Sequence, residues 1–349
     1  MRGAREWARR RRERGRGAAR RYACALRAVS SHNINMAVYE KAKRPTFYFI
    51  GVTTGKSSIM KVFPKWAEAL GLDAEIKGID LPLHAPDGQY REAADFLKND
   101  ALSLGALVTT HKLDMFRACR DMFDYIDPYA ERLKEVSSLS KRGAGKTEFR
   151  AHAKDPISSG LSLGEFVPAR FWADHGGEVL IIGAGGSALA ISMYLTQEFF
   201  GDDVPKRITI ANRSVPRLQS AEAALSGLNK RVEFRYVHGP SPEDNDRLVA
   251  GLPPYSLIVN ATGLGKDAPG SPTTDAVNYP ADSLVWEINY RGELIFMYQA
   301  QAQKAEKRLH IEDGWRYFIH GWTQVIAEVF DVEIGGELLQ KLSEIALKA

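Results

Sequence analysis

The stretch "VLIIGAGGSALAISMYL" (residues 179–195) decides the fold prediction. Its apolar start predicts a buried strand, the glycines at 183, 185 and 186 predict a tight turn, and the remainder predicts a helix. This order forms a cradle for a phosphate, because the helix N-terminus directs N–H groups and its positive dipole end at the anion. The spacing of Gly183, Gly185 and Ala188 fits a dinucleotide-binding fingerprint. Glycine turns also serve plain strand-to-helix packing, so the rest of the chain must decide between these two interpretations.

Strand and helix signals alternate on both sides of this stretch. The expected strands after residue 160 lie at 178–184, 207–213, 232–238, 255–262 and 283–289, and 308–314 is an optional sixth. Before it, strands are expected at 46–52, 74–81 and 104–111, helices at 58–72 and 90–100, and a hairpin over 136–153. Strands separated by helices of this length predict parallel sheets with right-handed crossovers. The sequence therefore predicts a two-domain α/β protein: a dinucleotide-binding Rossmann domain and an α/β substrate domain with a mostly parallel sheet.

The 349 residues are enough for two domains of ordinary size. We place a disordered basic extension at 1–45, a substrate-binding catalytic domain at 46–158 and the Rossmann domain at 159–314. The remaining residues, 315–349, are expected to be helices that return to the substrate domain.

The composition is that of a globular protein, with 44% hydrophobic and 26% charged residues. No apolar stretch is long enough to span a bilayer, so no membrane association is expected. Two cysteines, Cys24 and Cys119, cannot form a disulfide framework and have no neighbouring ligands typical of zinc. We therefore expect a cytoplasmic protein without a metal site.

The net charge of +4 comes from the N-terminal segment, since residues 1–35 hold eleven arginines and two glutamates. Arginine clusters bind nucleic acid or direct import into organelles. This segment has no pattern that could bury an apolar face, and Met36 offers a plausible second start. We favour a disordered or artefactual extension over a functional basic arm, and nucleic-acid binding is the weaker hypothesis.

The end of the second Rossmann strand predicts the choice of cofactor. A carboxylate at this position holds the ribose hydroxyls of NAD, whereas arginine accommodates the 2′-phosphate of NADP. Here the sequence reads "ANRSVPR", with Asn212, Arg213, Ser214 and Arg217 and no acid. Two guanidiniums and a hydroxyl suit a phosphate dianion. NADP is therefore preferred over the alternative, a solvated helix start with ordinary surface arginines.

Three segments, "GAGGSALA", "NRSVPR" and "VNATGLG", resemble the cofactor domain of the shikimate dehydrogenase family, which includes quinate/shikimate dehydrogenases. The resemblance extends over most of residues 46–340. It implies an Asn-Ala-Thr loop beside the nicotinamide of NADP. The cofactor-binding residues expected from the motifs are Gly183, Ala184, Gly185, Gly186, Ser187, Asn212, Arg213, Ser214, Arg217, Asn260, Ala261 and Thr262.

The resemblance also implies a catalytic pair, a lysine after the third strand and an aspartate before the cofactor domain. "VTTHK" places Lys112 at the first position and "HAKDPISSG" places Asp155 at the second. The chemistry supports both residue types, because oxidising a secondary alcohol requires a group that takes and returns the hydroxyl proton. The alternative is that Lys112 is a surface lysine, the commonest fate of lysine. His111 could tune the proton relay or be a simple surface histidine.

The expected substrate site departs from the family pattern. The proline before the lysine is absent, and the Asn-Thr-Asp-Gly stretch becomes residues 153–156, "AKDP". The substrate-binding glutamine falls on Gly321, with Gln324 one turn later. The residues left for substrate binding are Ser57 and Ser58 for the carboxylate, Ser137 in place of an asparagine, Tyr290, which matches the family, and Gln324.

These observations predict a shikimate dehydrogenase-like, NADP-dependent oxidoreductase that acts on a secondary alcohol of a cyclic hydroxy acid, of the shikimate/3-dehydroshikimate or quinate type. The altered substrate residues leave open whether shikimate itself is accepted. They also support the alternative of a non-catalytic NADP-binding regulatory or sensor protein of the same fold. A monomer or a homodimer is expected.

Overall fold

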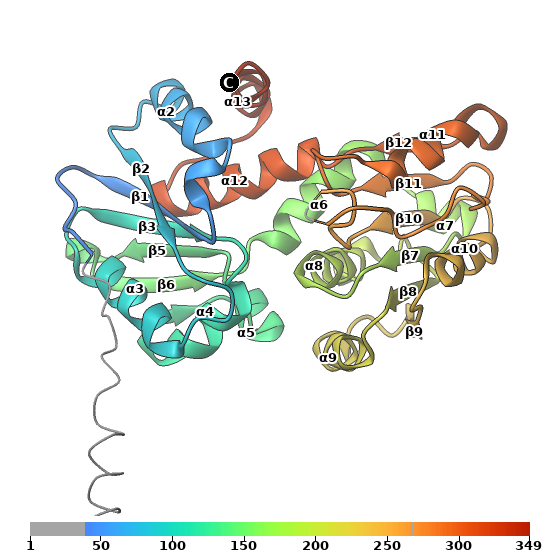
Figure 1. The fold of residues 1–349 in the computed structure, drawn as a ribbon, viewed down its shortest axis with the longest axis horizontal. Coiled ribbons are helices and arrows are strands. Elements are labelled where there is room, and N and C mark those ends of the chain that lie inside the picture. Colours follow the sequence, from blue (N-terminus) through green and yellow to red (C-terminus); the bar gives the residue numbers. More distant parts are fainter. Residues whose placement is uncertain (1–38, 267) are drawn as a thin grey trace, which may run out of the picture. The chain divides into compact units, whose positions relative to one another are not determined.

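The computed structural model describes residues 39–266 and 268–349 (Figure 1). Residues 1–38 of the predicted disordered extension 1–45 lie outside the described part of the chain, and so do the predictions for Cys24 and for a start at Met36. In the rest of that extension, Tyr39 stacks on Phe96 and the backbone N–H of Ala42 donates to Asp100 Oδ2 at 2.7 Å. Two six-stranded sheets make up the described chain, each covered by helices. In this part of the protein, no helix is long and apolar enough to cross a membrane.

The first sheet contains the strands of the N-terminal half, in the order β2-β1-β3-β5-β6-β4. Strands β1, β2 and β3 are parallel, whereas β5 runs antiparallel to both β3 and β6. The β5–β6 pair is the hairpin expected from the sequence. The strand bounds are β1 Thr46–Gly51, β2 Glu75–Asp80, β3 Ser103–Val108, β4 Tyr125–Ile126, β5 Ser138–Arg142 and β6 Glu148–His152.

The second sheet is fully parallel, in the order β12-β11-β10-β7-β8-β9. This is the doubly wound Rossmann order, in which ligands bind where the strand order reverses, beside β7. Five of these strands were expected and β12 was an optional sixth, because the central strands of such a sheet are short apolar runs. Their bounds are β7 Val179–Ile182, β8 Arg207–Asn212, β9 Glu233–His238, β10 Leu257–Asn260, β11 Leu284–Glu287 and β12 His310–Glu312.

The helices connect the strands and cover both sheets (Figure 1). Single-turn 3-10 helices lie at Thr54–Lys56, Arg120–Met122, Ala144–Lys146 and Glu198–Phe200. The α-helices are α2 Ile59–Leu70, α3 Asp87–Asn99, α4 Lys112–Cys119, α5 Pro128–Leu133, α6 Asp155–Phe166, α7 Phe171–His175, α8 Gly186–Leu195, α9 Val215–Leu225, α10 Pro242–Ala250, α11 Ile295–Lys307, α12 Trp315–Phe330 and α13 Gly336–Leu347.

The C-terminal helices α12 and α13 pack against the N-terminal half of the chain, although the two segments are far apart in the sequence. Trp322 of α12 stacks edge-on against Phe47 and Phe49 of β1. Trp66 of α2 is fully buried and donates a hydrogen bond to the Leu342 carbonyl of α13, 2.7 Å away. Burial of these large aromatic side chains stabilises the arrangement. As a result, α12 packs against the first sheet, although in sequence it follows the last strand of the second sheet.

Candidate active site

The glycine turn between β7 and α8 has the geometry of a phosphate cradle. Gly183 has φ +120°, and a Cβ there would overlap the carbonyl oxygen of Ala261, so only glycine fits. An added Cβ on Gly185 would meet no atom within 4 Å, so the space above the turn is open. No side chain caps the N-terminus of α8. The backbone N–H groups of its first turn therefore remain available for an anion.

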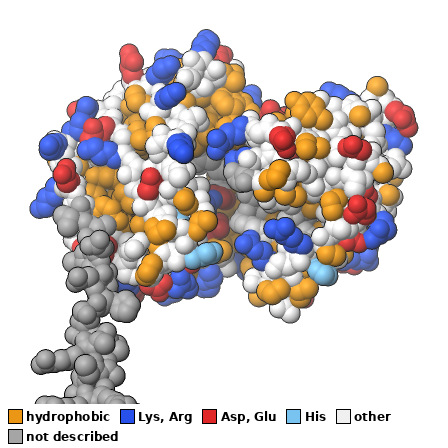
Figure 2. Space-filling model, in the orientation of Figure 1, with side chains coloured by type: hydrophobic (Ala, Val, Ile, Leu, Met, Phe, Trp, Pro, Cys, Tyr) orange, Lys and Arg blue, Asp and Glu red, His pale blue; other side chains and the backbone are white. Residues whose placement is uncertain are grey.

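The end of β8 carries the two arginines expected to select NADP. Asn212 closes this turn, since its Oδ1 accepts a hydrogen bond from the backbone N–H of Ser214, 2.8 Å away. Arg213 and Arg217 are exposed, and neither forms an ion pair with any described residue. In Figure 2, Lys and Arg side chains border the hollow between the two sheet-bearing parts of the described chain. An anionic ligand would therefore meet unpaired positive charge here.

The Asn-Ala-Thr loop after β10 is held by a buried acid that sequence reasoning missed. Asn260 is fully buried, and its Nδ2 donates to Glu287 Oε2 at 2.6 Å while its Oδ1 accepts from Thr262 Oγ1 at 2.7 Å. Burial raises the pKa of Glu287 to about 7, although hydrogen bonds from Asn289 and Asn260 act in the opposite direction. The buried Asn260 side chain therefore holds the loop in place through its hydrogen bonds to Glu287 and Thr262, and it does not point into open space.

The structure brings together the two residues of the predicted proton-transfer pair. Lys112 is the first residue of α4 and Asp155 the first residue of α6. Their side chains form a hydrogen-bonded ion pair and are mostly shielded from solvent, with 23% and 13% of their surface exposed. Asp155 at a helix N-terminus is also favoured by the helix dipole. The surface alternative for Lys112 is therefore wrong, because a surface lysine would not hold a buried carboxylate partner.

Nearby carboxylates set the charge of Lys112. Burial by itself lowers the pKa of this amine, but the charges of Asp155 and Glu135 outweigh burial and raise the pKa above its ordinary value. Lys112 is consequently a charged ammonium at neutral pH. The sequence did not predict that Glu135 lies at this site. Its presence as an acid just before the expected strand of "KEVSSL" was the sole indication.

Helix α12 contributes a further unexpected group, Tyr317. Its hydroxyl donates a hydrogen bond to Ser187 Oγ in the first turn of α8, 3.2 Å away. Burial and the charge of Asp155 raise the pKa of Tyr317 to about 12, so the phenol is neutral. The predicted cofactor cradle, the proton-transfer pair and the C-terminal helix therefore meet at one place.

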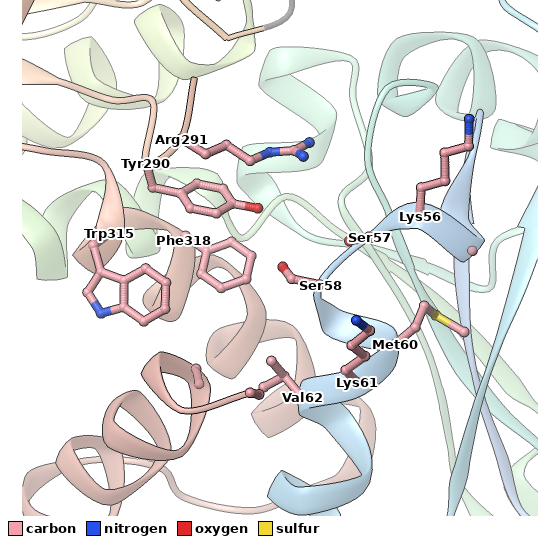
Figure 3. Close-up of a pocket in the computed structure, with 13 residues that line it drawn as sticks. Lys56, Ser57, Ser58, Met60, Lys61, Val62, Tyr290, Arg291, Trp315 and Phe318 are labelled. Carbon is pink, nitrogen blue, oxygen red and sulfur yellow. The ribbon is translucent and has the colours of Figure 1, made fainter. Parts of the chain in front are cut away.

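Three of the five predicted substrate residues line one cavity of 570 Å³ (Figure 3). Ser57 and Ser58 lie at the start of α2, and the hydroxyl of Tyr290 points toward them across the cavity. Lys56, Lys61 and Arg291 are among the residues that line the same cavity, although the Lys56 side chain extends away from the two serines, and Trp315 and Phe318 form its apolar wall. Lys112 and Asp155 do not line it.

Ser137 and Gln324 do not reach this cavity. Ser137 is buried, and its Oγ accepts a hydrogen bond from the backbone N–H of Lys154 at 2.8 Å. This contact fixes the chain directly before Asp155, so Ser137 supports the site from inside the protein. Gln324 is half-buried on α12 with no hydrogen bond from its side chain to another described residue.

Both expectations for His111 are corrected. The ring is buried, with Nδ1 3.1 Å from the Tyr90 hydroxyl and Nε2 within 3.2 Å of the carbonyl oxygens of Gly51 and Leu81. These contacts tie the start of α4 to the first sheet. His111 is therefore neither a surface residue nor part of a relay with Lys112, because its ring nitrogens are used elsewhere. Within residues 39–266 and 268–349, no group of three or more His, Cys, Asp or Glu side chains could hold a metal ion.

Comparisons with known proteins agree with this geometry. No protein-family model matches the chain. A curated relative named shikimate dehydrogenase (NADP(+)), from Methylobacterium radiotolerans, is 24% identical over 246 residues, which are 70% of this chain and 78% of the relative. Another of the same name, from Paramagnetospirillum magneticum, is 27% identical over 225 residues, 64% of this chain and 71% of the relative. A solved quinate dehydrogenase from Corynebacterium glutamicum, in complex with NAD, is 18% identical with a TM-score of 0.65 and covers 88% of this chain and 99% of its own.

These similarities confirm two predictions made from the sequence. The resemblance to shikimate dehydrogenases is real, and the fold is the two-domain α/β architecture with a Rossmann sheet. The predicted enzyme class also agrees with the relatives, which are named as NADP(+)-dependent dehydrogenases.

Proposed function

We propose that this protein is an NADP-dependent dehydrogenase that interconverts a secondary alcohol and a ketone on a small cyclic hydroxy acid, as shikimate and quinate dehydrogenases do. The observation that carries the proposal is the shielded Lys112–Asp155 ion pair, which lies beside a phenol that is hydrogen-bonded to the glycine cradle. The names of the curated relatives support both the reaction and the cofactor.

The cradle fits the cofactor. The open space above Gly185 and the uncapped N-terminus of α8 suit a pyrophosphate, and the unpaired guanidiniums of Arg213 and Arg217 suit a 2′-phosphate. When bound, NADP(H) would accept or supply the hydride. The loop of Asn260, Ala261 and Thr262 packs directly on the glycine turn and would border the nicotinamide.

Lys112 is the proton donor when a ketone is reduced. Its ammonium gives one proton to the substrate oxygen as hydride adds to the carbonyl carbon, and the alcohol results. Asp155 holds the ammonium in place and keeps it charged until transfer. In the reverse direction, the hydroxyl proton returns to Lys112 as the carbon loses hydride. Tyr317 closes the site on the side of the cradle.

We assign the substrate carboxylate to the cavity of Ser57, Ser58 and Tyr290, with Gln324 on the neighbouring helix outside it. The hydroxyls would hold a carboxylate. Because Lys112 does not line this cavity, the reacting oxygen of the substrate must extend from it to the Lys112–Asp155 pair. We further propose that residues 46–158 and 315–349 form the substrate domain and 159–314 the cofactor domain, in a cytoplasmic monomer or homodimer.

The experiment is an NADP(H)-linked activity screen over shikimate, quinate, 3-dehydroshikimate and related cyclic hydroxy acids. Turnover that disappears in Lys112→Ala supports the proposal. Tight NADPH binding without turnover of any of these compounds would instead support a non-catalytic sensor. The retained Lys112–Asp155 pair argues against that second function, because a sensor has no use for a proton donor.

A further inference from the structure

Glu135 is a buried carboxylate that the proposed reaction does not use. It lies between α5 and β5 and is 2% exposed. Its Oε1 has no hydrogen-bond partner in the described structure. A buried, unsatisfied carboxylate is costly, so its retention calls for a reason.

Glu135 faces the two halves of the proposed active site at once. On one side it interacts electrostatically with Lys112 at the start of α4 and with Asp155 at the start of α6. On the other side its Oε2 would lie 2.8 Å from a Cβ on Gly186, the first residue of α8. A carboxylate thus reaches the glycine turn on which the proposed function places the pyrophosphate.

We propose that Glu135 is a positioning residue that couples NADP(H) binding to uptake of a proton at the Lys112–Asp155 cluster. The inference rests on the proposed cofactor site. Without ligand, the ionised carboxylate is stabilised by Lys112 and by the positive end of α8. A bound pyrophosphate would compete for the same end of α8 and repel the carboxylate, and protonation of Glu135 relieves this repulsion.

The surrounding charges allow Glu135 to change its protonation state near neutral pH. Burial raises its pKa to about 7, Lys112 lowers it and Asp155 raises it. From α12, the neutral Tyr317 phenol interacts with Lys112 and Asp155 of the same cluster, and on α8 it is hydrogen-bonded to Ser187. Additional negative charge at the cradle raises the pKa further, so binding draws a proton onto Glu135.

The test is isothermal titration calorimetry of NADPH into the full chain at pH 7.5–8.5. The titration is repeated in two buffers that differ in ionisation enthalpy, because the difference in binding heat gives the number of protons taken up. The 2′-phosphate has its second pKa near 6 and contributes little in this range. The wild type should take up a substantial fraction of a proton for each NADPH bound. Its affinity should fall by about threefold to tenfold as the pH rises over this range.

Two variants separate Glu135 from other acids. Glu135→Gln keeps the size of the side chain but cannot titrate, so proton uptake should disappear and the affinity should vary less with pH. Glu131→Gln changes an exposed acid on α5 that pairs with Lys134 and Arg120, and should behave as the wild type. Absence of proton uptake in the wild type, or unchanged uptake in Glu135→Gln, would overturn the inference even if one variant folded poorly. Failure of the wild type to bind NADPH would instead overturn the proposed cofactor.

Discussion

The hydroxyl of Tyr317 donates a hydrogen bond to Ser187 Oγ across 3.2 Å, although the two residues are 130 positions apart. Tyr317 belongs to α12, which packs on the first sheet, and Ser187 belongs to the first turn of α8 in the second. The contact therefore links the C-terminal helix directly to the glycine cradle. It also places a neutral phenol close enough to the Lys112–Asp155 pair to interact electrostatically with both residues.

Tyr317→Phe should lower the free energy of unfolding by about 1 kcal/mol, because it removes one partly buried hydrogen bond and keeps the ring. Urea unfolding measures this change. Tyr298→Phe is the matched control, since Tyr298 is 58% exposed, and should have almost no effect. Equal stability of the two variants would show that the Tyr317–Ser187 contact does not stabilise the fold.

Lys112→Ala should lower kcat by about a hundredfold or more, because the proton donor is lost. The dissociation constant for NADPH should change much less than kcat, since the cofactor is assigned to the other sheet and Lys112 affects it only through the charge of Glu135. Asp155→Asn should have a similar effect, and the double variant should be scarcely worse than either single one, because members of one relay are not additive.

Lys65→Ala, at an exposed position on α2, is the control for this series. Steady-state kinetics on the best substrate of the screen, together with NADPH fluorescence titration, measure both quantities. Near-normal turnover of Lys112→Ala would remove Lys112 from the mechanism.

Much of the fold could be predicted because its signals are local. The central strands β7, β10 and β11 of the second sheet are buried and mostly apolar, and the glycine turn after β7 needs residues without a Cβ, which the sequence displays directly. Lys112 and Asp155 were predicted from the family resemblance, because each lies in a short motif at the start of a helix, and the structure brings the two side chains together. Glu135, Tyr317 and Glu287 were missed, because their partners come from distant segments and no local pattern records such contacts. For Glu287, the one sequence feature that pointed to it was a charged residue inside the otherwise mostly apolar segment "VWEIN".

His111 and Ser137 are two residues whose side-chain directions the sequence motifs did not predict. Both were interpreted from a neighbouring motif, yet each side chain turns inward and hydrogen-bonds backbone groups of the first sheet or the chain before Asp155. The direction of a side chain at the end of a strand depends on tertiary packing, which the motif does not contain.

Arg213→Ala combined with Arg217→Ala should weaken NADPH binding much more than NADH binding, since only NADPH carries the 2′-phosphate. Each lost charge-assisted contact should cost roughly 1.5–3 kcal/mol. Fluorescence titration with both cofactors measures the difference. Arg231→Ala combined with Arg247→Ala removes two exposed arginines elsewhere and should spare both affinities. An equal loss for NADPH and NADH would contradict the phosphate assignment.

Gly183→Ala and Gly185→Ala should fail in different ways. At Gly183 the positive φ and the overlap with the Ala261 carbonyl strain the backbone, so the melting temperature should fall by several degrees. At Gly185 the added methyl group meets no described residue within 4 Å other than its chain neighbours, so the fold should keep its melting temperature. It would, however, occupy the space proposed for the pyrophosphate, and the NADPH affinity should fall at least about tenfold. Unchanged NADPH binding by Gly185→Ala would place the cofactor elsewhere.

The buried pair of Asn260 and Glu287 allows a test by exchange of donor and acceptor. Asn260 Nδ2 donates to Glu287 Oε2 at 2.6 Å, and Glu287 Oε1 accepts from the backbone and side chain of Asn289. Glu287→Gln alone would set two amide donors face to face, and Asn260→Asp alone would set two carboxylates face to face. Each single variant should lower the free energy of unfolding by about 1–3 kcal/mol, because a buried polar group loses its partner. In the double variant the new carboxylate accepts from the new amide, while the hydrogen bonds to Thr262 and Asn289 remain. Stability in urea should therefore be higher than the sum of the two single losses predicts, and additive losses would show that this pair does not hold the loop.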